Sequence, residues 1–306
     1  MSHGRRGPEV PTCDVCGGHD CRVLYPSRLD REVEAADFRI TDKAYGTTGT
    51  IVVCSNCGLG YAFPRPPRER LETLYAELVD PAYCVEADGR AASCRRVLGR
   101  LEARLGGPGT LLDVGAATGI LLRVARERGW QVTGVEPSAW AARHAAAQHG
   151  LEVVCAPFPT PLLAGRVFDA VSMLDVLEHV DSPRRALEAA HERLRPGGLL
   201  CLVTPDAGSL VARLLGRRWW HVRVAHLYYF RRAPLWRLLA DTGFRLLERR
   251  RYGWTFSLEY LATRLDVSPV PAIVRRLRAS APGRWLLGRR LRVNFGDSFE
   301  VYATRA

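Results

Sequence analysis

Between residues 110 and 252, short apolar runs alternate with longer stretches whose apolar side chains recur at helical spacing. The short runs predict buried strands, and the stretches between them predict helices. Strands and helices in such an order are typical of a parallel sheet, because a parallel strand needs a long crossover before the chain can pair again. We therefore expect an α/β fold with a doubly wound, mostly parallel sheet.

The predicted elements follow from these periodicities. Strands are expected at residues 111–114, 131–135, 152–155, 168–173, 199–204 and 244–249, with a last strand at 298–304. Helices are expected at residues 120–128, 139–149, 184–194 and 233–242. Residues 253–295, which separate the last two strands, are rich in Arg, Trp and Leu and predict a helical insertion.

Composition divides the rest of the chain. Residues 1–66 are rich in turn-forming residues, hold five of the nine cysteines and end in a Pro-rich run. Residues 67–108 repeat apolar side chains at helical spacing and predict a helical linker or cap. We expect a small N-terminal module at residues 1–66, this linker, and a domain at residues 109–306 that holds the sheet and the insertion at 253–295.

Two Cys-x-x-Cys-Gly turns lie in the N-terminal module. Each turn directs two sulfur atoms inward, and its glycine tolerates the positive φ that the turn requires. Four thiolates leave no open coordination position, so the pattern predicts a structural Zn(II) rather than a catalytic one. A redox pair would be expected beside a βαβ unit, and neither turn lies in one. The expected ligands are Cys13, Cys16, Cys54 and Cys57, with His19 and Cys21 as substitutes.

The location of the protein is also constrained. No apolar run is long enough to span a bilayer, and the first residues lack the apolar core of a signal peptide. An odd number of cysteines without an export signal argues against a disulfide framework. We therefore expect a cytoplasmic protein without a transmembrane segment.

A small-residue turn, DVGAATG, connects the expected strand at 111–114 to the helix that follows it. Such a turn lets a ligand approach the backbone closely and points the amides of a helix N-terminus toward it. Glu136 ends the next strand, where a carboxylate can accept hydrogen bonds from both hydroxyls of a ribose. A dinucleotide-dependent oxidoreductase would share these two features.

Two further segments favour another family. Residues 168–180 read FDAVSMLDVLEHV and residues 194–198 read LRPGG, at the places of a fourth strand and of the turn before a fifth. With the glycine turn and GVEPS at 134–138, they resemble the class I S-adenosylmethionine-dependent methyltransferases over roughly residues 65–252 and the last strand. The resemblance implies a Rossmann-like fold and S-adenosyl-L-methionine as methyl donor.

The same resemblance implies a set of cofactor-binding residues. Asp113 would lie near the methionine amino group, Glu136 would bind the ribose, and Leu174 and Asp175 would lie beneath the methionyl part. No acid follows Cys155, where many relatives use one to hold the adenine amino group. The remaining expected contacts are Gly115, Ala116, Ala117 and Gly119 along the cofactor, Pro137 and Ser138 beside the adenine, and Ala156, Pro157 and Phe158 at the adenine edge.

Methyl transfer needs a base when the acceptor is a hydroxyl or an acidic carbon, and histidine is the usual candidate. His179 follows the fourth predicted strand, and His221 and His226 lie in the aromatic segment after the fifth. These three histidines are the candidate catalytic residues. A structural role, in which the imidazole only satisfies neighbouring groups, is the alternative for each.

The whole chain is similar to bacterial sugar and secondary-metabolite methyltransferases that carry such a cysteine module. This similarity implies O- or C-methylation of a small molecule, either a nucleotide- or lipid-linked sugar or a natural-product scaffold. An RNA methyltransferase with a zinc module is the alternative. A non-catalytic scaffold that keeps the fold is a third reading, which the intact glycine turn and Glu136 argue against.

Net charge bears on the partner. The chain carries a formal +12, and residues 207–306, with 20 arginines and 6 acidic residues, carry +14. Such a region suits a phosphate-bearing acceptor, a nucleic acid or an anionic membrane surface. We expect Arg275 and Arg276, in the insertion, to recognise a phosphate on the acceptor.

Overall fold

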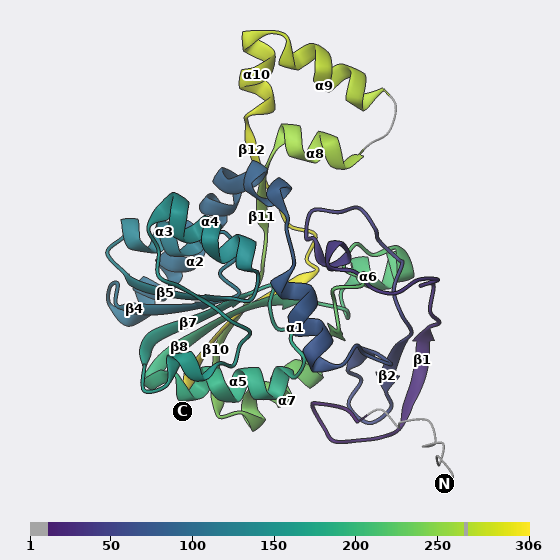
Figure 1. Ribbon diagram of the computed structural model, residues 1–306, viewed down its shortest axis with the longest axis vertical. Coiled ribbons are helices and arrows are strands. Elements are labelled where there is room, and N and C mark those ends of the chain that lie inside the picture. Colours follow the sequence, from purple (N-terminus) through teal and green to yellow (C-terminus); the bar gives the residue numbers. More distant parts are fainter. Residues whose placement is uncertain (1–11, 266–268) are drawn as a thin grey trace.

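The computed structural model describes residues 12–265 and 269–306. Residues 1–11 of the expected N-terminal module and residues 266–268 of the expected insertion lie outside the described residues. Figure 1 shows a sheet between two layers of helices, an N-terminal segment packed beside it, and a helical projection at one end. None of the helices in the described ranges is both long and apolar enough to cross a bilayer.

The central sheet confirms the predicted doubly wound topology. Its strand order is β10-β13-β8-β7-β4-β5-β6, in which neighbours from β8 to β6 pair in parallel and β13 runs antiparallel to both its neighbours. The strands are β4 (Thr110–Val114), β5 (Gln131–Glu136), β6 (Val153–Cys155), β7 (Phe168–Leu174), β8 (Leu194–Pro205), β10 (Phe244–Arg251) and β13 (Ser298–Arg305).

Helices cover both faces of this sheet (Figure 1). Side chains alternate between the faces along each strand, so Leu111 packs with α2 and α3 while Leu112 packs with α5 and α7. These helices lie close to the predicted ranges, and α4 covers the β5–β6 edge. Their bounds are α2 (Ala87–Leu105), α3 (Ile120–Glu127), α4 (Ala139–His149), α5 (Pro183–Glu192) and α7 (Arg232–Asp241).

The N-terminal segment forms a second, antiparallel sheet in the order β1-β2-β3-β9. Its fourth strand comes from the loop after β8, far along the sequence. Cys13 and Leu59 belong to the same buried cluster as Leu112 of β4, so the two sheets share one core. The strands are β1 (Cys21–Tyr25), β2 (Ile51–Cys54), β3 (Gly60–Ala62) and β9 (Tyr228–Tyr229).

Short helices connect these parts. Helix α1 (Arg68–Ala76) buries Leu71 and Leu74 in the shared core, and α6 (Leu210–Leu215) precedes the aromatic segment that leads to β9. Single turns of 3-10 helix lie at Ala35–Phe38, Pro81–Glu86, Pro161–Leu163 and Gly216–Arg218.

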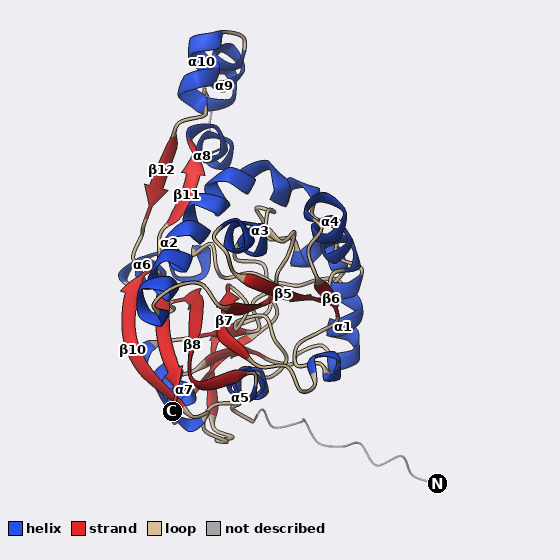
Figure 2. Cartoon of the chain, turned by 90° about the vertical axis from the view of Figure 1, so that its left-hand side faces the viewer, coloured by secondary structure: helices blue, strands red, loops and turns tan. Residues whose placement is uncertain are grey.

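The insertion differs from the helical prediction at both of its ends. Strands β11 (Trp254–Ser257) and β12 (Arg290–Val293) pair antiparallel and form a stalk. Trp254 and Phe256 alternate with Thr255 and Ser257, a period of two that suits a strand. Between the strands lie α8 (Leu258–Leu265), α9 (Val270–Arg278) and α10 (Ala281–Leu287), which project from the body (Figure 2).

Candidate active site

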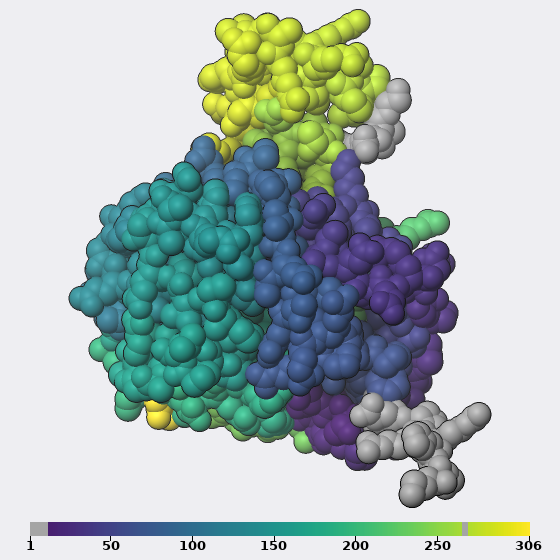
Figure 3. All heavy atoms as spheres, viewed as in Figure 1, coloured from purple at the N-terminus to yellow at the C-terminus, as the bar shows by residue number. Residues whose placement is uncertain are grey.

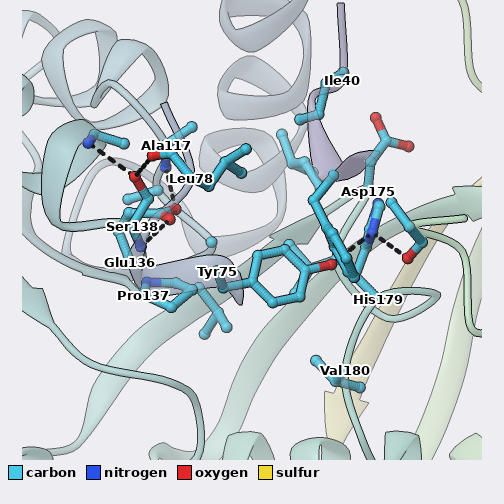
Figure 4. A pocket seen from close by; sticks show the side chains of 18 of the residues that line it. Ile40, Tyr75, Leu78, Ala117, Glu136, Pro137, Ser138, Asp175, His179 and Val180 are labelled. Carbon is cyan, nitrogen blue, oxygen red and sulfur yellow. Dashed lines mark hydrogen bonds between the residues drawn. The ribbon is translucent and has the colours of Figure 1, made fainter. Parts of the chain in front are cut away.

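A cavity of about 370 Å³ opens at the carboxyl ends of β4, β5 and β7, where ligands bind in parallel sheets of this kind. Figure 4 shows Ala117, Glu136 and Ser138 at one side and His179 at the other, with Tyr75 between them and its hydroxyl toward His179. The expected cofactor residues surround the first end, and the three candidate histidines line the second.

The glycine turn approaches the cavity by its backbone. Gly115 has a φ of +70°, and a Cβ at this position would lie 2.5 Å from a methyl group of Val176. Ala117 replaces glycine with a φ of 47°, and its amide donates to Glu136. Gly115, Ala116 and Ala117 all line the cavity, as the resemblance implied.

Gly119 has a different surrounding from the one expected. It does not line the cavity, and a Cβ there would lie 2.6 Å from Leu151 and 2.9 Å from Ala145. The absence of a side chain at Gly119 therefore lets α3 pack closely against the segment that follows α4.

Glu136 ends β5 and is buried. One carboxylate oxygen accepts from the Ala117 amide and the other from the Ser138 amide, both at 2.8 Å. Burial raises the pKa of Glu136, and the two amide hydrogen bonds oppose that shift. The carboxylate is thus held in position by the backbone, and Pro137 and Ser138 line the cavity beside it.

The next turn along the sheet supplies apolar side chains. Pro157 and Phe158 line the cavity, whereas Ala156 does not. The Ala156 amide instead donates to the carbonyl of Glu136 at 3.2 Å, which holds this turn beside β5. The position after Cys155 is therefore paired to β5 through its backbone and does not line the cavity.

Two aspartates line the cavity, of which Asp113 is buried and Asp175 half-buried. Asp113 accepts from the Ser172 hydroxyl at 2.7 Å, and burial raises its pKa to about 7. Asp175, which has a φ of 53°, has one carboxylate oxygen without a hydrogen-bond partner among the described residues. Burial raises its pKa to about 7 against the opposing charge of Arg90. Leu174 lines the cavity next to it.

Arg90 was not anticipated from the sequence. It comes from α2 and is buried, with its guanidinium carbon 3.7 Å from the centre of the Tyr83 ring. Its Nε has no hydrogen-bond partner within the described part of the chain. Arg90 precedes Ala91, Cys94 and Val97 on the buried face of α2, and an arginine next to such apolar residues is the sequence signal that could have identified it.

The three candidate histidines meet at the other end of the cavity. The ring centres of His179 and His226 lie 4.6 Å apart, and those of His226 and His221 lie 5.5 Å apart. Burial lowers the pKa of His179 and of His221 to about 3 and that of His226 well below its ordinary value. All three are therefore neutral near pH 7.

Hydrogen bonds determine which nitrogen of His179 is protonated. Its Nδ1 lies 2.8 Å from the carbonyl oxygen of Ala225, which can only accept, so Nδ1 carries the proton and Nε2 the lone pair. The Tyr75 hydroxyl lies 3.0 Å from the same Nδ1 (Figure 4). By contrast, Nδ1 of His226 is buried without a hydrogen-bond partner among the described residues.

A buried carboxyl group adjoins the histidines. Glu178 accepts from the Thr204 hydroxyl at 2.8 Å, and burial raises its pKa well above the ordinary value. Glu178, His179 and His226 each offer one ligand atom within 4.8 Å of the others. These three are the residues at the acceptor end that could hold a metal ion.

Segments outside the parallel sheet complete the acceptor end. Phe38 and Ile40 come from the N-terminal module, and Trp254, Phe256 and Tyr260 from the insertion. Buried Arg223 donates to the carbonyl of Ile40 at 3.1 Å and to Asp42 at 2.8 Å, and so ties the module to the segment that carries His226. Arg275 and Arg276 do not line the cavity, which contradicts their expected role in reading a phosphate there.

The four expected thiols also meet. The sulfurs of Cys13 and Cys57 lie 3.5 Å apart, as do those of Cys16 and Cys54, and all four lie within 4.8 Å of one another. A tetrahedral zinc with bonds of about 2.3 Å needs sulfurs about 3.8 Å apart, so the geometry fits this ion. The glycines after each pair have φ values of +70° and +78°, and His19 and Cys21 lie outside the group.

Thiol ionisation in this cluster is uneven. Burial raises the pKa of Cys13 to about 11. Burial also acts on Cys16, but hydrogen bonds from the Gly18 amide and the neighbouring thiols outweigh it and lower the pKa to about 7. A bound cation would favour the thiolate form of all four cysteines.

Comparison with known proteins agrees with this site. The model of a methyltransferase-domain family matches residues 87–249, slightly more than half of the chain. A ubiquinone biosynthesis O-methyltransferase of Idiomarina loihiensis is 37% identical over 100 residues, which are 31% of this chain and 41% of that protein. One from Cereibacter sphaeroides strain KD131 is 30% identical over 183 residues, 54% of this chain and 73% of that protein.

A solved structure with a similar fold is the 1,6-didemethyltoxoflavin-N1-methyltransferase of Burkholderia thailandensis, with bound 1,6-didemethyltoxoflavin and S-adenosylhomocysteine. It is 20% identical, with a TM-score of 0.51, and the match covers 88% of this chain and 98% of that one. The chain therefore belongs to the class I S-adenosylmethionine-dependent methyltransferases, which confirms the family predicted from DVGAATG, Glu136 and LRPGG. Against some curated relatives it spans less than half of their length.

Proposed function

We propose that this protein transfers a methyl group from S-adenosylmethionine to a small-molecule acceptor. One observation carries the proposal: the glycine turn with Glu136 and the cluster of three histidines line a single cavity. The methyl donor would occupy the part beside the glycine turn and the acceptor the part beside the histidines. The reaction needs both to be held in line and shielded from water, which a deep, largely apolar cavity favours.

The proposed donor contacts follow from the unfilled polar groups. Glu136 would accept from the two ribose hydroxyls, since each oxygen has a lone pair left after its backbone bond. Asp113 and Asp175 would face the methionine ammonium, and buried Arg90, with its unpaired Nε, would face the methionine carboxylate. Pro157 and Phe158 would pack against the adenine.

At the acceptor end we assign the base to His226. Its Nδ1 is buried without a partner among the described residues, and an acceptor hydroxyl would fill that hydrogen bond. The acceptor atom attacks the methyl carbon, the carbon–sulfur bond breaks with its electron pair on sulfur, and the acceptor proton passes to His226. His179 packs edge-to-face with this ring, His221 stacks on it, and both act as positioning residues.

The surroundings of His226 favour a class of acceptor. A base with a lowered pKa works best on an acceptor whose own proton is acidic, such as a phenol, an enol or an activated carbon. Phe38, Ile40, Phe256 and Tyr260 make the wall of this end apolar and aromatic. We therefore favour O- or C-methylation of an aromatic or enolic natural-product scaffold over methylation of a sugar.

We further propose that Cys13, Cys16, Cys54 and Cys57 bind one structural Zn(II). The cluster lies in the segment that supplies Phe38 and Ile40, and no thiol of the four lines the cavity. The ion would hold together a loop-rich segment whose own core is small. Its effect on the reaction would be indirect, through the position of the acceptor wall.

The proposal is tested by following the transfer of labelled methyl from S-adenosylmethionine to parallel panels of phenolic and enolic compounds, nucleotide sugars and total RNA. We expect label in the first panel. Label in nucleotide sugars alone would contradict the acceptor class but keep the enzyme. Label in RNA alone would overturn the small-molecule assignment, and failure to bind S-adenosylmethionine would overturn the proposal as a whole.

A further inference from the structure

Helices α9 and α10 stand away from the rest of the molecule. They are carried on the stalk of β11 and β12 and on α8, and Figures 1, 2 and 3 show them beyond the body of the protein. We call residues 269–289, which comprise these two helices and the turns beside them, the tip. None of its residues lines the cavity of the candidate active site.

The charges of the tip all have one sign. It holds five arginines and no acidic residue, namely Arg275, Arg276, Arg278, Arg284 and Arg289. Arg278 pairs with Glu259 of α8, with Nε and Oε1 2.5 Å apart. Arg275 and Arg276 are exposed and form no ion pair with any acid in the described ranges. The tip therefore has positive charge that no acidic side chain in the described ranges neutralises.

Large apolar side chains lie among these arginines. Trp285 is 67% exposed, Ile273 49% and Leu286 42%. The packing between the two helices uses other residues: Val274 and Leu287 are buried, and Gly283 touches the backbone of Leu277, where a Cβ would lie 2.1 Å from its carbonyl oxygen. The exposed apolar side chains are thus not needed for the internal packing of the tip.

We propose that the tip docks this protein onto an anionic phospholipid surface. Short amphipathic helices bind such a surface when arginines reach the phosphates and Trp, Leu or Ile side chains enter the interface below them. Trp285 suits this position because its ring is apolar and its N–H is polar. The Arg289 guanidinium carbon lies 5.1 Å from the centre of the Trp285 ring, so the two groups would enter the interface together.

The same features argue against other partners. A nucleic acid offers phosphates for the arginines, but it offers no apolar layer for the aliphatic side chains of Ile273 and Leu286. A second copy of this chain would bring five more arginines against these five. Negative charge and an apolar layer occur together at the surface of an anionic bilayer, which complements both properties of the tip.

Docking would also orient the cavity. Trp254 and Phe256 of β11 and Tyr260 of α8 line the cavity, and β11 pairs with β12, which follows the tip directly in the chain. A protein held by the tip would therefore have the stalk that supplies this wall of the cavity next to its membrane attachment. The docking itself does not depend on the proposed reaction, because it rests on exposure and charge alone.

Co-sedimentation with vesicles tests the inference, using the full chain and vesicles of phosphatidylcholine with or without 30 mol% phosphatidylglycerol. We expect binding to the anionic vesicles and weak binding to the neutral ones. Each arginine near such a surface contributes about a fivefold factor in partitioning, so R275E/R276E should weaken binding at least about 25-fold. R232E/R245E changes two exposed arginines on the body and should keep wild-type binding.

Insertion of the apolar side chains is tested separately with brominated lipids, which quench tryptophan fluorescence at short range. Wild type should be quenched on anionic vesicles, and W285F should lose most of that quenching while it still sediments. L162S, a change at an equally exposed site on the body (65%), should keep it. Circular dichroism of each variant verifies folding.

Three outcomes would overturn the inference. One is equal binding to neutral and anionic vesicles, and another is unchanged binding by R275E/R276E. The third is retention of the protein by RNA in preference to anionic vesicles at the same ionic strength, lost in R275E/R276E, which would assign the tip to nucleic acid instead. If R275E/R276E loses vesicle binding but transfers methyl at the wild-type rate in detergent, the docking is supported independently of the catalytic proposal.

Discussion

The donor end and the acceptor end of the cavity are built from the chain in different ways. The donor end uses the turns after β4, β5, β6 and β7, which follow one another within about sixty residues, and it is held by backbone hydrogen bonds such as those to Glu136. The acceptor end combines Phe38, Tyr75, His226 and Phe256, which come from four separate parts of the chain.

This difference indicates in which part of the cavity the specificity for the acceptor can change. Residues at the donor end depend on the sheet, so a substitution there disturbs the shared architecture of the family. Residues at the acceptor end depend on how the N-terminal module and the insertion pack on the body. Variation in those two segments could alter the acceptor without altering the donor site. The four predictions below test this separation.

The largest effect is expected at the acceptor end. Replacing His226 with Asn should lower kcat by about 100- to 10,000-fold, because the acceptor proton loses its base. The affinity for S-adenosylmethionine, measured by calorimetry, should not change. His149→Asn, a change at the end of α4 away from the cavity, is the control. A second metal ion per chain, beyond the zinc of the four cysteines and lost in His226→Asn, would instead assign His226 to a metal site with Glu178 and His179.

The second prediction concerns the connection between the two ends. Wild-type protein should contain about one zinc per chain by elemental analysis. Cys54→Ser should lose it and lower the free energy of unfolding by on the order of 4 kcal/mol, the scale of a lost metal site. Because the module shares its core with the main sheet and supplies the acceptor wall, acceptor KM should rise more than the Kd of S-adenosylmethionine.

Residues 1–66 are not expected to unfold alone in Cys54→Ser, because Gly60 and Tyr61 of β3 pair with β9 of the methyltransferase part. Cys155→Ser, at an exposed thiol outside the cluster, should leave both properties unchanged. Metal-free wild-type protein, prepared without chelator, would contradict the zinc site.

The third prediction concerns the donor end. Glu136→Ala should weaken the binding of S-adenosylmethionine about 100-fold, since two hydrogen bonds to a charged acceptor contribute roughly 3 kcal/mol together. Acceptor KM at saturating donor should stay the same. Glu152→Ala removes a surface carboxylate paired with Arg166 and serves as the matched control. An equal loss in both variants would show that Glu136 does not bind the ribose.

The smallest effect is a pH dependence of donor binding. The pKa of Asp113 in the free protein is raised to about 7 by burial, with a further contribution from the charge of Glu136. Ionised Asp113 attracts the methionine ammonium and the protonated form does not, so affinity is present above pH 7 and lost as the pH falls. Between pH 8 and pH 6 the ionised fraction drops about tenfold.

We expect the association constant to fall by about this factor, and Asp175, whose pKa is also raised to about 7, adds to the change in the same direction. In Asp113→Asn, the part of this pH dependence that comes from Asp113 should be absent. An affinity that stays constant from pH 6 to pH 8 in the wild type would contradict the placement of both carboxylates next to the ammonium.

Prediction from sequence succeeded where one segment contained the information. The helix at 139–149 matches α4, and the strand at 111–114 lies within β4, because strand and helix periodicities are local properties. It was less accurate about which residues of an expected turn line the cavity. Gly119 and Ala156 belong to the expected turns but contact neighbouring segments instead, and the local pattern does not show which residues of a turn meet the ligand.

The insertion shows a related limit. Its composition predicted helices, and three are present, but Trp254 and Phe256 lie on a strand because β12 pairs with it from more than thirty residues away. Arg275 and Arg276 were expected in the acceptor site. The stalk instead carries them outward, a consequence of strand pairing that composition does not reveal.

The amino-acid sequence was enough to establish the family, the glycine turn, the carboxylate that follows β5 and the four thiols, since each depends on neighbours within a few residues. The meeting of His179, His221 and His226 required the folded chain. Their rings come together because Leu227 and Tyr228 donate backbone hydrogen bonds to the carbonyl of Glu178, a contact between segments about fifty residues apart. Such long-range packing brings the three imidazoles together in a largely desolvated place, lowers their pKa values and turns separate candidates into one site.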